Sequence, residues 1–143
     1  MRREVQVGDY RIVGDPASLD MELAHRALSR ESYWARGRSR EDHDRAFASS
    51  RVAVALDAAG ATVAFARAVT DGVTHAWLAD VWVEPDHRGR GLGTAVTEFL
   101  VDAPDLADVG RWALVTSSAQ QLYRRLGFTD YEAPPTLMQR RRP

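Results

Sequence analysis

The sequence predicts an α+β domain in which a mixed, mostly antiparallel central sheet is flanked by helices. The first observation is a run of three strand-like segments joined by short turns, a pattern typical of an antiparallel meander: 51–56, 62–69 and 74–83. The second is a pair of segments in which apolar residues recur with helical spacing, 92–100 and 119–126, with a short apolar strand at 112–115 between them. The expected order is β-α-α-β-β-β-α-β-α-β.

The N-terminal part supplies the first strand and the first two helices of this order. Alternation predicts a strand over 5–13, which Asp15-Pro16 ends. Ser18 is the expected N-cap of a helix that carries Leu19, Leu23, Ala27 and Leu28 on one face. Residues 32–40 are expected to form a loop, and Ser39 to cap a short polar helix that runs through Phe47.

The C-terminal part supplies the remaining elements. Pro104 is expected to stop the helix that begins after the glycine-rich stretch. The tetrapeptide 118–121 matches a capping box, which predicts a helix that Gly127 ends. Residues 128–131 are expected to form the last strand. The length of 143 residues fits a single domain over 1–143.

Composition excludes several classes of function. The chain has no cysteine, so disulfides, thiolate metal sites and a cysteine acyl-enzyme are excluded, and its four histidines lack metal-ligand spacing, so no metal is expected. Its formal net charge of −1 predicts no general attraction to nucleic acid or to an anionic membrane. No apolar run approaches a bilayer span, and the N-terminus lacks the apolar stretch of a signal peptide. We therefore expect a cytoplasmic protein.

A glycine-rich segment joins the longest predicted strand to the most amphipathic helix. It reads Arg88-Gly89-Arg90-Gly91-Leu92-Gly93-Thr94. Glycines allow close backbone approach, and the free N–H groups of a helix start form an anion site. A Walker loop needs lysine, which this chain lacks, and a dinucleotide fingerprint needs a parallel sheet. A pyrophosphate held in another fold is the favoured interpretation, and a purely structural turn is the alternative.

These motifs give the chain a family resemblance. The segment 88–93 is similar to the Arg/Gln-x-x-Gly-x-Gly/Ala signature of the GCN5-related N-acetyltransferases, the GNAT family, and 80–85 resembles the strand before it. Downstream, 122–128 is similar to the family's Tyr-x-x-x-Gly-Phe segment. The resemblance covers 74–128 most strongly. It implies a GNAT-like fold and a transferase that moves an acetyl group from acetyl-CoA to an amine.

The resemblance also implies how acetyl-CoA is held. Backbone groups of Val81, Trp82 and Val83 would pair with the pantetheine arm, because the next strand splays away in this family. The pyrophosphate would be held by the turn Arg88, Gly89, Arg90, Gly91, Leu92, Gly93 and Thr94. The absence of cysteine agrees with direct attack of the amine in a ternary complex.

The catalytic candidates are a phenol and two carboxylates. Tyr123 is the expected general acid for the departing thiolate, although its helical stripe alone would make it a core residue. Many relatives carry a glutamate on the long strand, and here Trp77 fills that place. Asp80 is then the nearest candidate base, with Glu84 behind it. Burial among apolar neighbours should raise the pKa of Asp80, and an ion-pair role is the equal alternative.

The acceptor side is expected to be aromatic. Tyr33 and Trp34 lie in the loop that covers the acceptor site in the family, and Trp77 could complete the wall. The acceptor itself, a small-molecule or peptide amine, cannot be chosen from the sequence, and a homodimer stays open. The alternative to an enzyme is a non-catalytic CoA-binding sensor or scaffold of the same fold. We expect neither a nucleic-acid nor a membrane partner.

Overall fold

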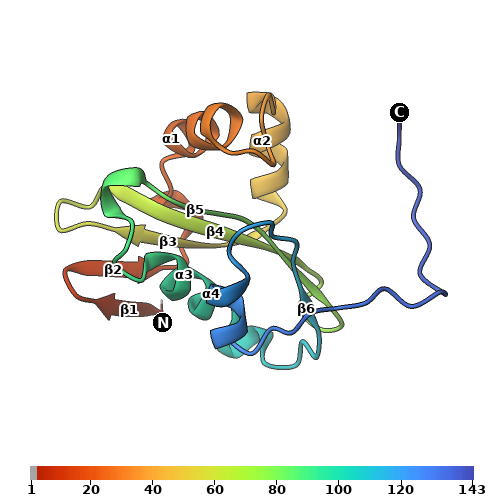
Figure 1. Cartoon of the computed structure of the whole chain (residues 1–143). Coiled ribbons are helices and arrows are strands. Elements are labelled where there is room, and N and C mark those ends of the chain that lie inside the picture. The colour runs from red at the N-terminus through yellow and green to blue at the C-terminus, as the bar shows by residue number, and fades with distance from the viewer. Residues whose placement is uncertain (1–2) are drawn as a thin grey trace.

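The computed structural model describes residues 3–143 as one six-stranded sheet between two layers of helices (Figure 1). The strands lie side by side in chain order: β1 (Glu4–Val7), β2 (Tyr10–Val13), β3 (Arg51–Leu56), β4 (Thr62–Thr70), β5 (Ala76–Val83) and β6 (Trp112–Ala113). Neighbouring strands are antiparallel except for the parallel pair β5 and β6. The predicted α+β class and mixed, mostly antiparallel sheet are confirmed.

The first predicted strand is two strands. Residues 4–7 and 10–13 form a hairpin whose two-residue loop is Gly8-Asp9. Gly8 has a φ of 57°, a left-handed conformation that glycine adopts without a steric penalty. Because apolar residues alternate on both sides of this loop, the two strands look continuous in the sequence. The hairpin adds one strand to the expected order.

One helical layer covers the first face of the sheet (Figure 1). It consists of η1 (Pro16–Ser18), α1 (Met21–Arg26), the π-helical turn η2 (Ala27–Glu31) and α2 (Arg40–Ala48). The N-cap of α1 is Asp20, whose carboxylate accepts from the Leu23 N–H, so the expected cap at Ser18 is wrong. The expected cap at Ser39 is confirmed, since its hydroxyl accepts from the Asp42 N–H.

The second layer lies on the opposite face (Figure 1). It contains α3 (Leu92–Val101), η4 (Pro104–Leu106) and α4 (Gln120–Arg125), and η3 (Pro85–His87) lies at the end of β5, before the chain crosses to this layer. The predicted capping box does not form, because Ala119 is the N-cap of α4 and the Thr116 hydroxyl accepts from its N–H instead. Gly127 follows α4 with a φ of 92°, which agrees with its expected place after the helix.

Each face of the sheet has its own apolar core. On the α3 side, small strand residues such as Ala53 and Ala66 are fully buried and pack with Val96 and Phe99. On the α1 side, larger residues such as Phe65 pack with the helical layer. The central strands β3 and β4 are buried on both faces and therefore read as nearly continuous apolar runs.

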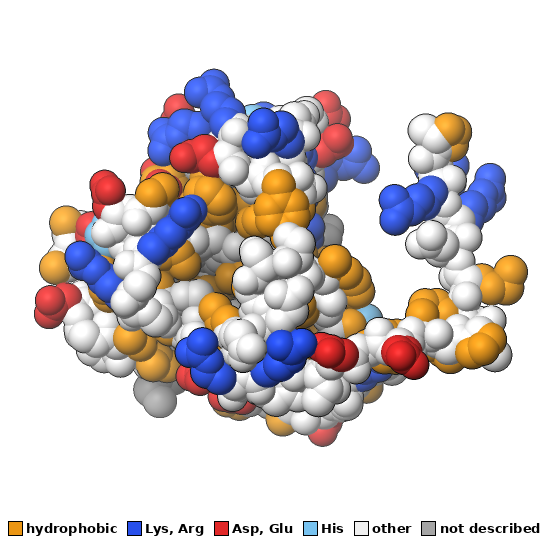
Figure 2. All heavy atoms as spheres, in the orientation of Figure 1, with side chains coloured by type: hydrophobic (Ala, Val, Ile, Leu, Met, Phe, Trp, Pro, Cys, Tyr) orange, Lys and Arg blue, Asp and Glu red, His pale blue; other side chains and the backbone are white. Residues whose placement is uncertain are grey.

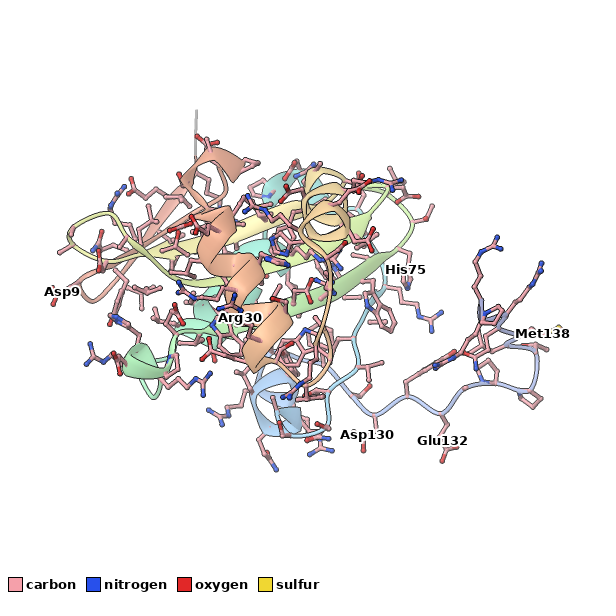
Figure 3. All side chains as sticks on the ribbon, turned by 90° about the horizontal axis from the view of Figure 1, so that it is seen from above. Asp9, Arg30, His75, Asp130, Glu132 and Met138 are labelled. Carbon is pink, nitrogen blue, oxygen red and sulfur yellow. The ribbon has the colours of Figure 1, made fainter. Side chains whose placement is uncertain are left out.

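The C-terminal segment leaves the body of the molecule as an extended tail. Figure 3 shows Asp130, Glu132 and Met138 along it, beyond the end of α4. The predicted strand over 128–131 is wrong: no strand forms there, and the last strand of the described chain, β6, has only two residues. Phe128 packs against the core instead, with its ring 5.9 Å from that of Tyr123. Within residues 3–143, no helix is long and apolar enough to cross a membrane.

A buried histidine makes the fold sensitive to acid. His43 on α2 is fully buried, and neither ring nitrogen has a hydrogen-bond partner among the described residues. Its ring stacks on Phe47 at 4.4 Å and lies edge-on to His25 at 5.4 Å. Burial, reinforced by the nearby charges of His25 and Arg38, lowers the pKa of His43 from 6.5 to about 4.

We therefore expect the His43 contribution to stability to be complete above pH 6.5 and to be lost as the pH falls towards 4. Over that range the free energy of unfolding should fall by about 3 kcal/mol because the unfolded chain takes up the proton first. Denaturant unfolding of the wild type and of His43→Leu between pH 4 and 7 measures it. An equal acid-induced loss in the two proteins would contradict the assignment.

Candidate active site

A cleft of about 690 Å³ opens where β5 and β6 separate. The two strands pair only at Ala76 with Trp112 and at Trp77 with Ala113. Beyond Trp77, β5 continues to Val83 while the chain after β6 turns away as a loop, so no described strand pairs with that edge over 78–83. Figure 2 shows hydrophobic side chains gathered below helices α1 and α2, where the surface is hollowed. The expected splaying of the strand that follows β5 is present.

A β-bulge distorts β5 beside this open edge. Phe65 pairs with Trp82 and Arg67 pairs with Ala79, so the two residues Asp80 and Val81 lie opposite one residue of β4. Asp80 has a φ of 52° and is the only non-glycine residue with a positive φ among residues 3–143. Aspartate tolerates this region better than most residues, and bulges commonly redirect backbone groups next to active sites.

The Asp80 carboxylate is buried in a cluster of donors. Its side chain is 1% exposed and accepts from Trp34 Nε1 at 2.9 Å, from Arg38 Nη1 at 2.8 Å and from Arg67 Nε at 2.6 Å. Burial alone would raise the pKa of Asp80, but the hydrogen bonds and charges of Arg38 and Arg67 outweigh it and lower that pKa. The expectation of a raised pKa is wrong. The Asp80 carboxylate is therefore ionised, and both of its oxygens accept hydrogen bonds.

The loop between η2 and α2 presents two aromatic side chains to the cleft. Buried Ser32 anchors the loop, since its hydroxyl donates to the Leu28 carbonyl at 2.6 Å and accepts from the Ala35 N–H. The Tyr33 hydroxyl accepts from the Ser117 N–H at 3.2 Å and thereby ties this loop to the one after β6. Hydrogen bonding with the side chain of Ser117, and then with its N–H, lowers the pKa of the Tyr33 phenol. Trp34 lies edge-on to Tyr33 at 5.0 Å.

Tyr123 closes the cleft from α4. Its ring is buried and lines the same cleft as Val81, Trp82 and Val83. Burial, with a smaller effect from Tyr33, raises the pKa of Tyr123 to about 12. The phenol is therefore protonated at every pH at which the protein would ordinarily be assayed, and it can serve as a proton donor.

The glycine-rich turn lies at the N-terminus of α3, next to the end of β5. Gly91 is the N-cap with a φ of 78°, and a Cβ built on it would meet no atom within 4 Å. Gly93 lines the cleft, and its Cβ would lie 3.2 Å from Leu122, so this glycine also permits close packing of α3 on α4. Leu92 is a core residue and Thr94 is half-buried.

Both arginines of the turn, Arg88 and Arg90, donate hydrogen bonds within the protein. Arg90 donates to the Tyr10 hydroxyl at 2.8 Å, and the same hydroxyl contacts His87 Nδ1 at 2.8 Å, which fastens the turn to β2. Arg88 donates to the Val83 carbonyl at 3.0 Å and lies 5.0 Å above the Trp82 ring. Of residues 88–94, Arg88 and Gly93 line the cleft.

Most of the residues singled out in the sequence meet in this one cleft. Its lining includes Tyr33, Trp34, Trp77, Asp80, Val81, Trp82, Val83, Arg88, Gly93 and Tyr123. Glu84 does not line it; its carboxylate accepts from Trp82 Nε1 at 3.3 Å and lies 3.9 Å from Arg26. Sequence reasoning missed Arg38 and Arg67, because only the folded chain brings these two arginines together on Asp80.

Known proteins with this fold and these motifs place the chain in a family. The family model of the acetyltransferase (GNAT) domain matches residues 48–130. A solved structure from Xanthomonas campestris pv. campestris, described as an acetyltransferase of the GNAT family, superimposes with a TM-score of 0.88 at 38% identity and covers 96% of both chains.

Curated relatives agree. A Gibberella zeae protein named as an acetyltransferase is 29% identical over 87% of this chain and 81% of its own length. The rice Serotonin N-acetyltransferase 2 is 46% identical over 52% of this chain, which corresponds to 38% of that protein. With the open strand edge, the glycine-rich turn and the tyrosine of α4 in one cleft, the chain belongs to the GNAT family of acetyltransferases.

Proposed function

We propose that the protein transfers the acetyl group of acetyl-CoA to a primary amine by direct attack in a ternary complex. The observation that carries the proposal is the cleft itself, in which the unpaired β5 edge, the Tyr123 phenol and the start of α3 converge. The pantetheine arm pairs with backbone groups of 81–83 as a missing strand would. The pyrophosphate binds the peptide N–H groups of 88–94 at the helix start.

The reaction needs few protein groups. The neutral amine attacks the thioester carbon, and a C–N bond forms while negative charge develops on the carbonyl oxygen. A backbone N–H beside the β5 bulge stabilises that oxygen. Collapse breaks the C–S bond, and the CoA thiolate takes the proton of the Tyr123 hydroxyl, which solvent restores. The amide nitrogen loses its extra proton to water.

Neither carboxylate candidate serves as the base in this proposal. Asp80 has a lowered pKa and its oxygens accept from two arginines and a tryptophan, so it acts as a positioning residue for the bulge and the loop. Glu84 lies outside the cleft lining. The amine therefore enters as the small neutral fraction present at neutral pH, or loses its proton through water.

The test is ligand-dependent stabilisation. Acetyl-CoA at about 100 times its Kd should raise the unfolding temperature by about 8 °C, while amines alone should leave it unchanged. Gly91→Val should abolish this shift, because a branched side chain at the N-cap blocks the approach of the pyrophosphate. The absence of any shift with the wild type at millimolar acetyl-CoA would overturn the proposal.

Gly60→Val is the matched control. Gly60 also has a positive φ, 86°, and open space around a built Cβ, but it lies in the turn between β3 and β4. The backbone strain is therefore comparable, whereas the cleft is untouched. Gly60→Val should melt at a lower temperature and keep the full acetyl-CoA shift. If Gly91→Val keeps it as well, the turn is structural only.

A further inference from the structure

The lining of the cleft has an unbalanced charge on its acceptor side. Arg38 and Arg67 share one partner, Asp80, and Asp80 is the only carboxylate among the described residues that line the cleft. Arg88 belongs to the turn proposed to hold the phosphates of acetyl-CoA, and it donates to the Val83 carbonyl at the end of β5. With the cofactor's phosphates next to Arg88, the acceptor side retains one positive charge in excess.

Arg38 can use this excess to bind a ligand. A guanidinium has five N–H donors, and Asp80 accepts from Nη1 at 2.8 Å and from Nη2 at 3.4 Å. About a fifth of the Arg38 side chain is exposed, and it lines the cleft. Arg67 is more buried, and it also donates to the Ser50 hydroxyl at 3.1 Å. Arg38 is thus the cation that a carboxylate on the acceptor can reach.

The surfaces around Arg38 are aromatic. Tyr33 is 59% exposed, Trp34 is 42% exposed and Trp77 is 40% exposed, and all three line the cleft. Trp34 also donates its indole N–H to Asp80, so the ring is fixed beside the arginines. Large aromatic surfaces held open in a cleft are suited to stacking on a planar ring.

We propose, on the basis of the proposed function, that the acceptor is an aromatic amine that carries a carboxylate, the class to which the aromatic amino acids belong. The ring stacks between the aromatic side chains and the carboxylate pairs with Arg38. The same excess positive charge lowers the pKa of the acceptor's ammonium group and so raises the fraction of the neutral amine. A polyamine would bring a second cation into a positively charged cleft and is disfavoured.

The test uses pairs of acceptors that differ only in the carboxylate. With acetyl-CoA, release of free CoA is measured for tryptophan against tryptamine, for phenylalanine against phenethylamine, and for cadaverine. We expect kcat/KM to be about 10-fold or more higher for each amino acid than for its decarboxylated partner, as for a charge-assisted hydrogen bond. Cadaverine should be the poorest acceptor. Equal or better use of tryptamine, phenethylamine or cadaverine overturns the proposal.

Two variants locate the selectivity. Arg38→Gln should lower kcat/KM for tryptophan to the level of tryptamine and leave tryptamine nearly unchanged. Trp77→Ala, outside the ion-pair cluster, should lower kcat/KM for both indoles about equally, and it tests the aromatic wall even if Arg38→Gln does not fold. Val73→Ala, a truncation of an exposed apolar residue in the turn before β5, is the control without effect. Retention of the tryptophan preference in folded Arg38→Gln overturns the pairing with Arg38.

Failure of this inference is distinguishable from failure of the proposed function. If acetyl-CoA raises the unfolding temperature but no aromatic amino acid is acetylated, the acceptor class is wrong and the cofactor site stands. If acetyl-CoA has no effect on unfolding, the proposed function itself is wrong.

Discussion

Replacing Asp80 by alanine is expected to lower the free energy of unfolding by about 3–5 kcal/mol, the usual cost of removing one partner from a buried ion pair. The carboxylate is buried between two guanidinium groups, and without it Arg38 and Arg67 repel each other at low exposure to solvent. Trp34 also loses the hydrogen bond that its indole N–H donates to Asp80, so the aromatic loop is less firmly held. Urea unfolding followed by tryptophan fluorescence measures the loss.

Two further variants separate charge from backbone. Asp80→Asn keeps the shape of the side chain and tolerates the left-handed φ of 52°, so its loss of stability reports the missing charge. Asp44→Ala breaks the exposed pair between Arg40 and Asp44 on α2 and should cost about 0.3–0.5 kcal/mol. If Asp80→Ala costs no more than Asp44→Ala, the cluster does not stabilise the fold.

The pH dependence of Asp80 has a definite sign. Its folded-state pKa lies below the ordinary value of 3.8, so its stabilising contribution is complete above that value. The contribution is lost as the pH falls through the lowered pKa of the folded state. Acid sensitivity near pH 5 therefore belongs to His43, whose neutral form is the buried one.

Tyr123→Phe is expected to lower kcat by at least about 10-fold, and up to the 10²–10⁴-fold typical of general acid catalysis. The ring and its contact with Phe128 are retained, so stability and the KM for acetyl-CoA should change little. Because burial raises the pKa of the Tyr123 phenol to about 12, the phenol stays protonated throughout an ordinary pH profile. The loss should therefore be a constant factor between about pH 6 and 10.

The control for this variant is Tyr131→Phe. Tyr131 is 59% exposed in the C-terminal tail, outside the cleft lining, and its hydroxyl should be dispensable. Steady-state kinetics of both variants with the best acceptor decide the question. Unchanged kcat in Tyr123→Phe would make solvent the proton source and leave Tyr123 as a packing residue. Binding of acetyl-CoA without turnover in the wild type would instead favour a CoA-binding sensor.

Local patterns predicted most of the fold. Helical spacing located α3 and α4, and the short turn expected between the segments 62–69 and 74–83 separates β4 from β5. The Gly8-Asp9 turn carried a comparable signal but was hidden by alternation on both sides. The strand expected at 128–131 has the composition of a strand, but a strand forms only with a hydrogen-bonding partner, and none lies beside it among the described residues.

The candidate site was also predictable in part, because some of its residues belong to local sequence patterns. The glycine-rich turn and Tyr123 belong to short motifs that can be read in the sequence. The Asp80 cluster joins residues 13, 42 and 46 positions apart, and such pairings depend on how the layers dock. The low pKa of Asp80 followed from those distant partners, since burial alone would have raised it. The periodicity of apolar residues carries no information about which distant side chains will contact Asp80.

The strand order, identical to the chain order, has a consequence for how the protein is made. As the chain leaves the ribosome, the pairs β1–β2, β3–β4 and β4–β5 form between strands that are joined by short turns, so these pairings are short in sequence separation and fast to form. Two pairings must wait: that of β2 with β3, which follows the segment containing α1 and α2, and that of β5 with β6, which follows the crossover through α3. The residues proposed to form the acceptor wall, from Tyr33 to Trp77, are thus synthesised before the turn proposed to hold the cofactor and before the proposed proton donor, Tyr123.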